Sequence, residues 1–211
     1  MYVLYLDEAS VKINRKMATS LILKTAVPIL ASIALEHFQL RWMFSSLYQS
    51  SSIVPGVSRI YGLVIAVNVI STAVVLLILG TKVGQSRNKF IEKASKDGDK
   101  DAEDRFSYPK MYAEGFSKHA KQFNCIQRSH QHALETYTQF VALSLVSGLL
   151  FPLVTTIAGA LWVYARLQWA LGYQSGEPKK RYEHWSAYGI WTSLLIVLFG
   201  SITSAVLIVI K

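Results

Sequence analysis

The sequence predicts an all-α, polytopic membrane protein built as a four-transmembrane-helix bundle. Of its 211 residues, 52% are hydrophobic and only 17% are charged. Its mean hydropathy of +0.30 lies above the range usual for soluble domains. Long uncharged runs alternate with short polar turns, and about 20 apolar residues are what an α-helix needs to cross the hydrocarbon core. These observations predict one helical membrane domain with one longer polar loop.

The first part of the chain, residues 1–55, is predicted to be an extension that precedes a membrane domain over residues 56–211. Its apolar stretch Leu21–Leu35 is interrupted by Lys24 and Pro28, and it is short for a membrane span. Basic residues before the stretch suit a membrane anchor or a targeting segment, although nearby acidic residues argue against a transit peptide. Both alternatives remain open for this extension.

Four membrane spans are predicted in the domain. Ile60–Gly80 and Trp185–Ile210 contain no charged residue, and each is long enough to cross a bilayer. Between them, apolar character extends from Ala133 to Val154 and then over Thr155–Tyr173. Because proline breaks a continuing helix, Pro152 predicts a tight reversal. The second and third spans are therefore expected to form an antiparallel hairpin.

A polar loop is predicted over residues 82–122. Its segment Glu92–Arg105 mixes both charge signs with almost no apolar residues, which is typical of a solvated, disordered connection. Lysine and arginine gather in this loop and in the turn Gly176–Arg181, so both are expected on the cytoplasmic side. Membrane topology thus accounts for the net charge of +9, and no nucleic-acid partner is predicted.

Cysteine and histidine usage predicts neither a disulfide framework nor a metal site. Cys125 is the single cysteine, so no disulfide can form within the chain. His130 and His132 are two residues apart and would point to different sides of a helix.

The stretch Phe123–Tyr137, FNCIQRSHQHALETY, places polar residues at the start of the second span. Arg128, His132 and Glu135 are spaced at i, i+4 and i+7, so they share one helix face, which cannot point at lipid. One interpretation is an Arg–Glu ion pair that only fixes packing. The other is a site for a ligand with both a carboxylate and an ammonium group.

Two polar residues inside other spans also need partners. Arg166 lies in the third span, with Trp169 and Tyr173 on the same face at i+3 and i+7. Because the second and third spans are hairpin neighbours, their polar faces are expected to converge near the cytoplasmic surface. Asn68 in the first span is expected to bond a neighbouring helix.

Three motifs carry a resemblance to a known family. FNCIQRxHQxxLE occupies Phe123–Glu135, GYxxGEPxKR occupies Gly172–Arg181, and YPKMY occupies Tyr108–Tyr112. With the predicted spans, they make Ile60–Lys211 resemble the membrane-associated proteins in eicosanoid and glutathione metabolism (MAPEG). The resemblance is closest to the microsomal glutathione S-transferase 3 subgroup.

The resemblance implies a homotrimer that spans the endoplasmic reticulum membrane several times, with the mitochondrial outer membrane as the alternative compartment. Glutathione would be the co-substrate, bound between adjacent subunits at the cytoplasmic face, with no metal. The implied activity is that of a glutathione S-transferase, a glutathione peroxidase or both, acting on lipophilic electrophiles or lipid hydroperoxides from the bilayer. The alternative is a non-catalytic protein that binds and presents lipids.

The resemblance also implies which residues bind glutathione. Arg128 and Glu135 match the second-helix glutathione motif, with Glu135 expected to hold the γ-glutamyl amino group. Arg87 falls where the family has a basic ligand after the first helix, and Tyr173 matches a tyrosine that lines the peptide. His132 completes the expected set, although the family usually has asparagine at this position.

The expected catalytic cation is Lys180 or Arg181, one of which matches the arginine thought to stabilise the thiolate in related synthases. Trp169 stands where the family usually has tyrosine. Tryptophan donates a hydrogen bond but does not accept one, and histidine can carry charge. Two polar contacts to glutathione are thus expected to differ from those of the family.

Overall fold

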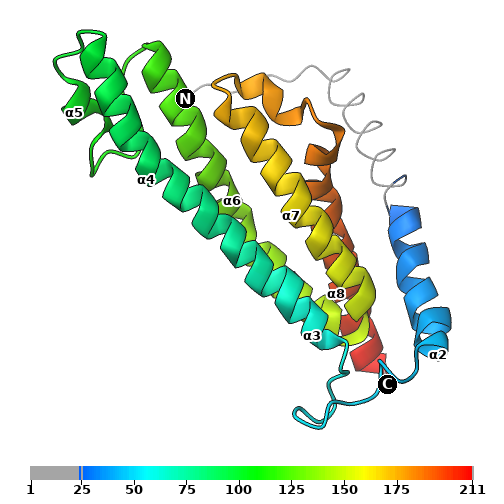
Figure 1. Ribbon diagram of the computed structural model, residues 1–211. Coiled ribbons are helices and arrows are strands. Elements are labelled where there is room, and N and C mark those ends of the chain that lie inside the picture. The colour runs from blue at the N-terminus through cyan, green and yellow to red at the C-terminus, as the bar shows by residue number, and fades with distance from the viewer. Residues whose placement is uncertain (1–23, 25, 211) are drawn as a thin grey trace, which may run out of the picture.

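The computed structural model describes residue 24 and residues 26–210, which contain helices and no strand (Figure 1). This confirms the all-α class. Long helices run antiparallel to their neighbours in the chain. We call the end that carries the short helix α5 (Ala102–Phe106) the α5 end. The opposite end, where α6 (Lys118–Leu150) turns into α7 (Pro152–Gln174), is the hairpin end.

The first long helix is one rod made of three consecutive segments. These are α3 (Tyr61–Val64), the π-helical η2 (Ile65–Ser71) and α4 (Thr72–Lys96). The rod continues well past Gly80, where the predicted span ended, because buried side chains keep a helical spacing beyond that point. These buried residues are Val83, Arg87, Phe90 and Ala94.

Asn68, in the π-helical turn, joins the three central helices. Its Nδ2 donates to Oγ of Ser144 on α6 at 3.0 Å and to the carbonyl of Thr155 on α7 at 2.9 Å. The prediction that Asn68 bonds a neighbouring helix is therefore confirmed. An added Cβ at Gly159 would overlap the Asn68 amide, so this glycine allows α7 to approach the rod closely.

The predicted disorder of Glu92–Arg105 is wrong. The rod extends to Lys96, and α5 folds back onto it. Phe106 at the end of α5 is fully buried, 5.9 Å from the ring of Phe90 and 5.6 Å from the ring of Phe123. Composition predicted a solvated loop, but Phe106, just after the charged run, packs in one apolar cluster with Phe90 and Phe123 and so holds α5 in place.

The predicted hairpin is confirmed. Phe151 alone links α6 and α7, and Pro152 takes the first position of α7, where a proline nitrogen needs no hydrogen bond. After α7, the short helices η3 (Pro178–Tyr182) and η4 (Trp185–Tyr188) lead into α8 (Gly189–Ile210).

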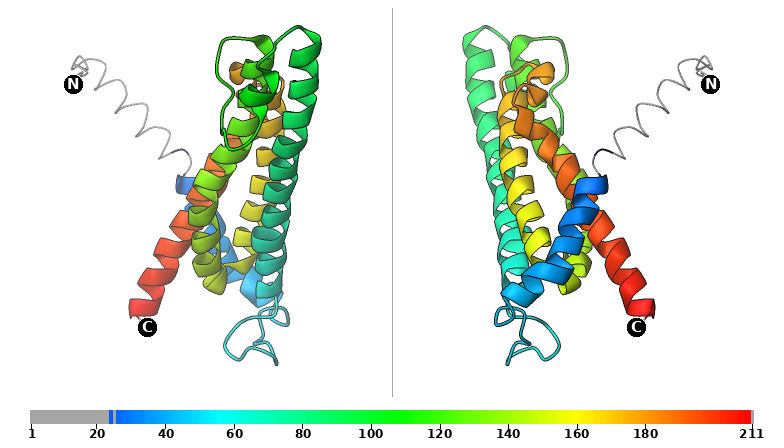
Figure 2. Two further views of the ribbon diagram at one scale, coloured as in Figure 1. Left: turned by 90° about the vertical axis from the view of Figure 1, so that its left-hand side faces the viewer. Right: turned by 90° about the vertical axis from the view of Figure 1, so that its right-hand side faces the viewer.

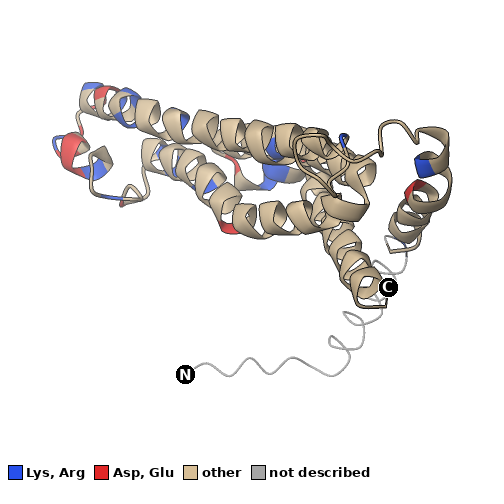
Figure 3. Cartoon of the chain, turned by 90° about the horizontal axis from the view of Figure 1, so that it is seen from below, with Lys and Arg blue, Asp and Glu red and all other residues tan. Residues whose placement is uncertain are grey.

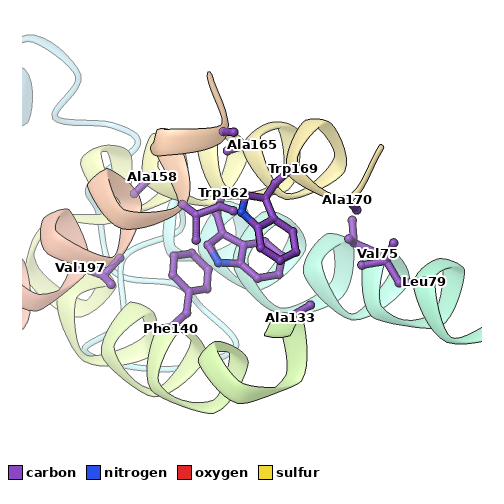
Figure 4. Packing of buried hydrophobic residues seen from close by; sticks show 12 residues of the cluster. Val75, Leu79, Ala133, Phe140, Ala158, Trp162, Ala165, Trp169, Ala170 and Val197 are labelled. Carbon is purple, nitrogen blue, oxygen red and sulfur yellow. The ribbon is translucent and has the colours of Figure 1, made fainter. Parts of the chain in front are cut away.

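The main core lies where α4, α6, α7 and α8 meet (Figure 4). The rings of Phe140 and Trp162 stack at 5.2 Å, and Trp169 lies beside Trp162 in the same cluster. Small residues let the helices approach, since an added Cβ at Gly200 on α8 would overlap Ser147 on α6. Packing in this core sets how far α6 and α7 are shifted along their axes and which faces they turn toward each other.

The described part of the predicted extension is helical and packs on the bundle. Helical residues 26–35 continue through η1 (Glu36–Leu40) and α2 (Arg41–Met43), and we call residues 26–43 the N-terminal helix. It lies beside α8, away from the α5 end (Figure 2). Ile29 and Ile33 pack with Phe151 and Val154 in a small core. The alternative prediction, a targeting segment, falls mainly on residues 1–23, which lie outside the described residues.

Among the described residues, three helices are long and apolar enough to cross a membrane, judged by length and composition: Tyr61–Lys96, Lys118–Leu150 and Trp185–Ile210. α7, predicted as a further span, has 23 residues but is not among them. Charged residues gather toward the α5 end of the chain, whereas α8 has none (Figure 3).

Candidate functional site

A hollow near the α5 end brings several predicted residues together. Its volume is about 510 Å³, and it lies between the first half of α6, the end of α7 and the loop of residues 107–117. The lining residues are Tyr112, Gly115, Phe116, Lys121, Asn124, Cys125, Arg128, Tyr173 and Pro178. Two members of the predicted glutathione set, Arg128 and Tyr173, thus line the same hollow.

Arg128 and Glu135 form an ion pair along α6. Nη1 of Arg128 lies 2.6 Å from Oε1 of Glu135, and the side chains are 36% and 44% exposed. The shared helix face expected from their spacing is therefore present. An exposed pair of this kind contributes about 0–1 kcal/mol to stability. Both groups are accessible to a partner with complementary charges.

His132 lies deeper than Arg128 and points toward α7. Its ring stacks on Trp169 with centroids 4.5 Å apart, and its Nδ1 lies 2.8 Å from Nη1 of Arg166. Arg166 is fully buried, and its Nη2 donates to Oγ1 of Thr136 at 2.7 Å. His132, Arg166, Trp169 and Thr136, which we call the inner cluster, are thus bonded mainly to one another.

The partner that Arg166 needs is not Glu135. Glu135 pairs with Arg128, whereas the guanidinium of Arg166 packs over the rings of Trp162 and Trp169 at 4.9 and 5.7 Å. Aromatic faces attract a cation when water is excluded. Among the described residues, no carboxylate forms an ion pair with Arg166.

Arg87 lies apart from the hollow. It is 5% exposed, its Nη1 donates to the carbonyl of Phe106 at 2.8 Å, and its guanidinium packs over the ring of Tyr108 at 4.2 Å. These contacts join the rod to the end of α5. The structure therefore places Arg87 away from Arg128 and Tyr173 within one subunit.

The two candidate catalytic cations lie on different surfaces. The guanidinium of Arg181 lies over the ring of Tyr173 at 5.7 Å, and its Nη1 donates to the carbonyl of Pro178 at 2.6 Å. Lys180 is exposed and lines a separate hollow with Gln168. Arg181 is therefore on the side of Arg128, and Lys180 is not.

The loop of residues 107–117 contributes residues that the sequence reasoning did not assign to the site. Tyr112 hydrogen-bonds Gln131 on α6. Asn124 holds the loop through both of its amide atoms: Oδ1 accepts from the nitrogen of Ala113, and Nδ2 donates to its carbonyl, each at 2.8 Å. The YPKMY motif was the signal that could have assigned Tyr112.

Lys121 adds a second cation to the hollow. Its Nζ lies 2.9 Å from Oε1 of Glu177, in the turn after α7. The Lys121 ammonium lowers the pKa of Glu177 by this hydrogen bond and by its charge. The pair joins the start of α6 to the turn that carries Arg181.

Cys125 also lines the hollow, and its side chain is almost fully buried there.

In a comparison with protein-family models, residues 65–206 match the MAPEG family. The match covers more than half of the chain and includes α4, α6, α7 and most of α8. It begins after the N-terminal helix. The family includes glutathione transferases and peroxidases as well as non-catalytic members. With the three membrane-helix candidates and the hollow around Arg128, the match shows that this chain is a membrane protein of the MAPEG family.

Proposed function

We propose that the protein is a membrane-bound glutathione transferase and peroxidase of the microsomal glutathione S-transferase 3 type. One observation carries the proposal: a single hollow gathers Arg128 and Tyr173, and Arg181 packs on Tyr173 beside it. Family membership adds that related proteins use glutathione. Hydrophobic substrates would reach the site from the bilayer.

Glutathione would bind by exchanging partners with the Arg128–Glu135 pair. Its γ-glutamyl carboxylate would pair with the guanidinium of Arg128, and its ammonium group would pair with the carboxylate of Glu135. Such exchange costs little because the pair is exposed. Lys121, which lines the hollow, would bind the second carboxylate of the peptide by exchanging its exposed partner Glu177 in the same way. Tyr173 would line the peptide backbone.

The catalytic requirement is a thiolate. A thiol of pKa about 8.5 is only a few per cent ionised at pH 7, and lowering the pKa by two units takes about 2.7 kcal/mol. Arg181 is favoured over Lys180 because it shares the Tyr173 side of the chain. A guanidinium stays charged throughout the relevant pH range.

Two reactions follow from a bound thiolate. In conjugation, sulfur attacks an electrophilic carbon, forms an S–C bond and displaces the leaving group or opens the ring. In peroxide reduction, sulfur attacks the terminal oxygen of a lipid hydroperoxide and breaks the O–O bond. The alkoxide takes a proton to become the alcohol, and a second glutathione converts the sulfenic acid to glutathione disulfide and water.

The assembly and orientation are part of the proposal. α7 would be the fourth span, and the α5 end would face the cytoplasm because lysine and arginine gather there (Figure 3). The exposed Arg128–Glu135 face suits a homotrimer with glutathione between subunits. Arg87 would serve a neighbouring subunit only if it left its bond to Phe106. The endoplasmic reticulum membrane is the proposed location, with the mitochondrial outer membrane as the alternative.

The experiment is turnover with glutathione in detergent, using an electrophile in one assay and a lipid hydroperoxide in the other. Arg128→Ala should raise KM for glutathione, and Arg181→Ala should lower kcat about 100-fold, in line with the loss of one thiolate-stabilising cation. Lys180→Ala tests the other candidate cation, and Arg59→Ala, an exposed arginine at the hairpin end, is the matched control. Turnover that matches the rate without enzyme would refute the proposal.

A non-catalytic lipid-binding protein is the second candidate function. The inner cluster favours it, because His132 and Trp169 contact each other and Arg166 rather than the hollow. The discriminating measurement is glutathione binding followed by thiolate absorbance in the ultraviolet. Saturable binding with a thiolate signal supports the enzyme, whereas lipid binding without that signal supports the lipid-presenting protein.

A further inference from the structure

A second cavity lies on another side of α7. It is formed by Lys24, the N-terminal helix, α7 and α8. Its volume is about 280 Å³, and most of its wall is aliphatic. The lining residues are Lys24, Pro28, Ile29, Ser32, Val154, Ile157, Thr192 and Ile196. It shares no residue with the hollow around Arg128.

Among the described residues that line this wall, Lys24 is the one that carries a charge. Among the described residues it has no hydrogen bond or ion pair. The cavity also touches Thr192 and Ile196, which belong to the membrane-helix candidate Trp185–Ile210. The side chain of Lys24 is itself exposed, so its ammonium group can meet an anionic ligand at the edge of the cavity.

The backbone near Lys24 adds a second polar group. Pro28 lies four residues after Lys24, and proline has no N–H to donate to the carbonyl of Lys24 as the next helical turn would require. The hydroxyl of Ser32 is already engaged with the carbonyl of Pro28 at 2.8 Å. The cavity therefore has one polar end, which carries the ammonium group of Lys24, and an apolar remainder.

We propose that this cavity binds a free long-chain fatty acid, with the carboxylate on Lys24 and the alkyl chain against Ile29, Ile157 and Ile196. A carboxylic acid can enter the bilayer in its neutral form and release its proton when it pairs with the ammonium group. A phosphodiester stays charged and is held at the headgroup level. With a volume of about 280 Å³, the cavity has room for one alkyl chain and not for the two chains of a phospholipid, which favours a fatty acid.

The cavity depends on Lys24 and on the N-terminal helix. Half of the described lining residues, Lys24, Pro28, Ile29 and Ser32, precede the family match at residues 65–206. The cavity is also independent of the glutathione proposal, because no residue of the Arg128 hollow takes part. Its ligand would occupy the protein whether or not glutathione turns over.

The test uses the full chain in nanodiscs of phosphatidylcholine and a palmitic acid with a diazirine near the end of its chain. Photolysis and peptide mapping should place the label on α7 near Ile157 or on α8 near Ile196. Lys24→Gln should reduce labelling about tenfold, the usual effect of losing a charged hydrogen-bond partner, and Lys24→Arg should restore it. Lys118→Gln, at an exposed lysine near the α5 end, is the matched control.

A second variant fills the cavity without changing charge: Ile157→Trp should also reduce labelling, and a competing excess of hexadecanol should not. Equal labelling of wild type and Lys24→Gln would overturn the proposal, because the cavity would then be a general apolar crevice. Displacement of the probe by phosphatidylglycerol would overturn it in favour of a phospholipid headgroup.

Discussion

Glu36 is a buried carboxylate that holds two distant parts of the chain together. Its oxygens accept the backbone N–H groups of Leu153 at 2.8 Å and Val154 at 2.7 Å, in the first turn of α7. The hydroxyl of Tyr48 donates to it at 2.6 Å. A negative charge at a helix N-terminus is favoured by the helix dipole and by the free N–H groups there. Glu36 therefore caps α7 from outside the helix.

Replacing Glu36 by alanine should destabilise the protein by about 3 kcal/mol, because two buried N–H groups and one hydroxyl lose their acceptor. The measurement is thermal unfolding in detergent, monitored by circular dichroism. Glu183→Ala removes an exposed carboxylate and serves as the control. Equal unfolding temperatures for the two variants would contradict the role given to Glu36.

Replacing His132 distinguishes a residue that only packs the bundle from a residue that binds glutathione. Because its ring stacks on Trp169 and contacts Arg166, His132→Asn should cost about 1 kcal/mol of stability through the lost stack. The same variant should change KM for glutathione less than twofold, whereas Arg128→Ala should raise it. A large rise in KM for His132→Asn would instead make His132 a ligand of glutathione.

Among the structural elements, the loop of residues 107–117 forms the wall of the hollow that is not helical. It carries Tyr112 and Phe116, and the side chain of Phe116 is fully exposed. The two hydrogen bonds from Asn124 to Ala113 hold the middle of the loop against α6. Asn124 thus supplies two of the hydrogen bonds that position the loop, alongside the bond of Tyr112 to Gln131.

Asn124→Ala should release this loop. Two lost hydrogen bonds of about 1 kcal/mol each would raise the open population more than tenfold, and trypsin should cut after Lys110 correspondingly faster. Asn88→Ala, at an exposed position on α4, is the control. An unchanged cleavage rate would show that other contacts hold the loop.

For the whole molecule, composition and periodicity predicted the helical class, the hairpin at Pro152 and the polar bond of Asn68. They did not predict α5, because the apolar residues that fold it, Phe90 and Phe123, lie outside the charged run. Spacing on α6 predicted the shared face of Arg128 and Glu135. The sequence did not show which of Lys180 and Arg181 lies beside the Arg128 hollow, because adjacent residues in a turn can face opposite sides.

The proposed orientation can be tested with single cysteines in a Cys125→Ser background. Asp101→Cys, at the α5 end, should react with a membrane-impermeant maleimide on sealed microsomes. Ser52→Cys, in the loop before α3, should react only after detergent is added, because the positive residues favour the α5 end on the cytoplasmic side. The reverse pattern would invert the topology.

The contact between Glu36 and Leu153 joins residues 117 positions apart in the chain. At the usual speed of synthesis, the N-terminal helix would wait about ten seconds for the start of α7 to emerge. During that interval the carboxylate of Glu36 has no helix end to cap and has to remain hydrated or be held by another protein. Insertion of this protein is therefore expected to finish late, when α7 arrives and draws the N-terminal helix into place.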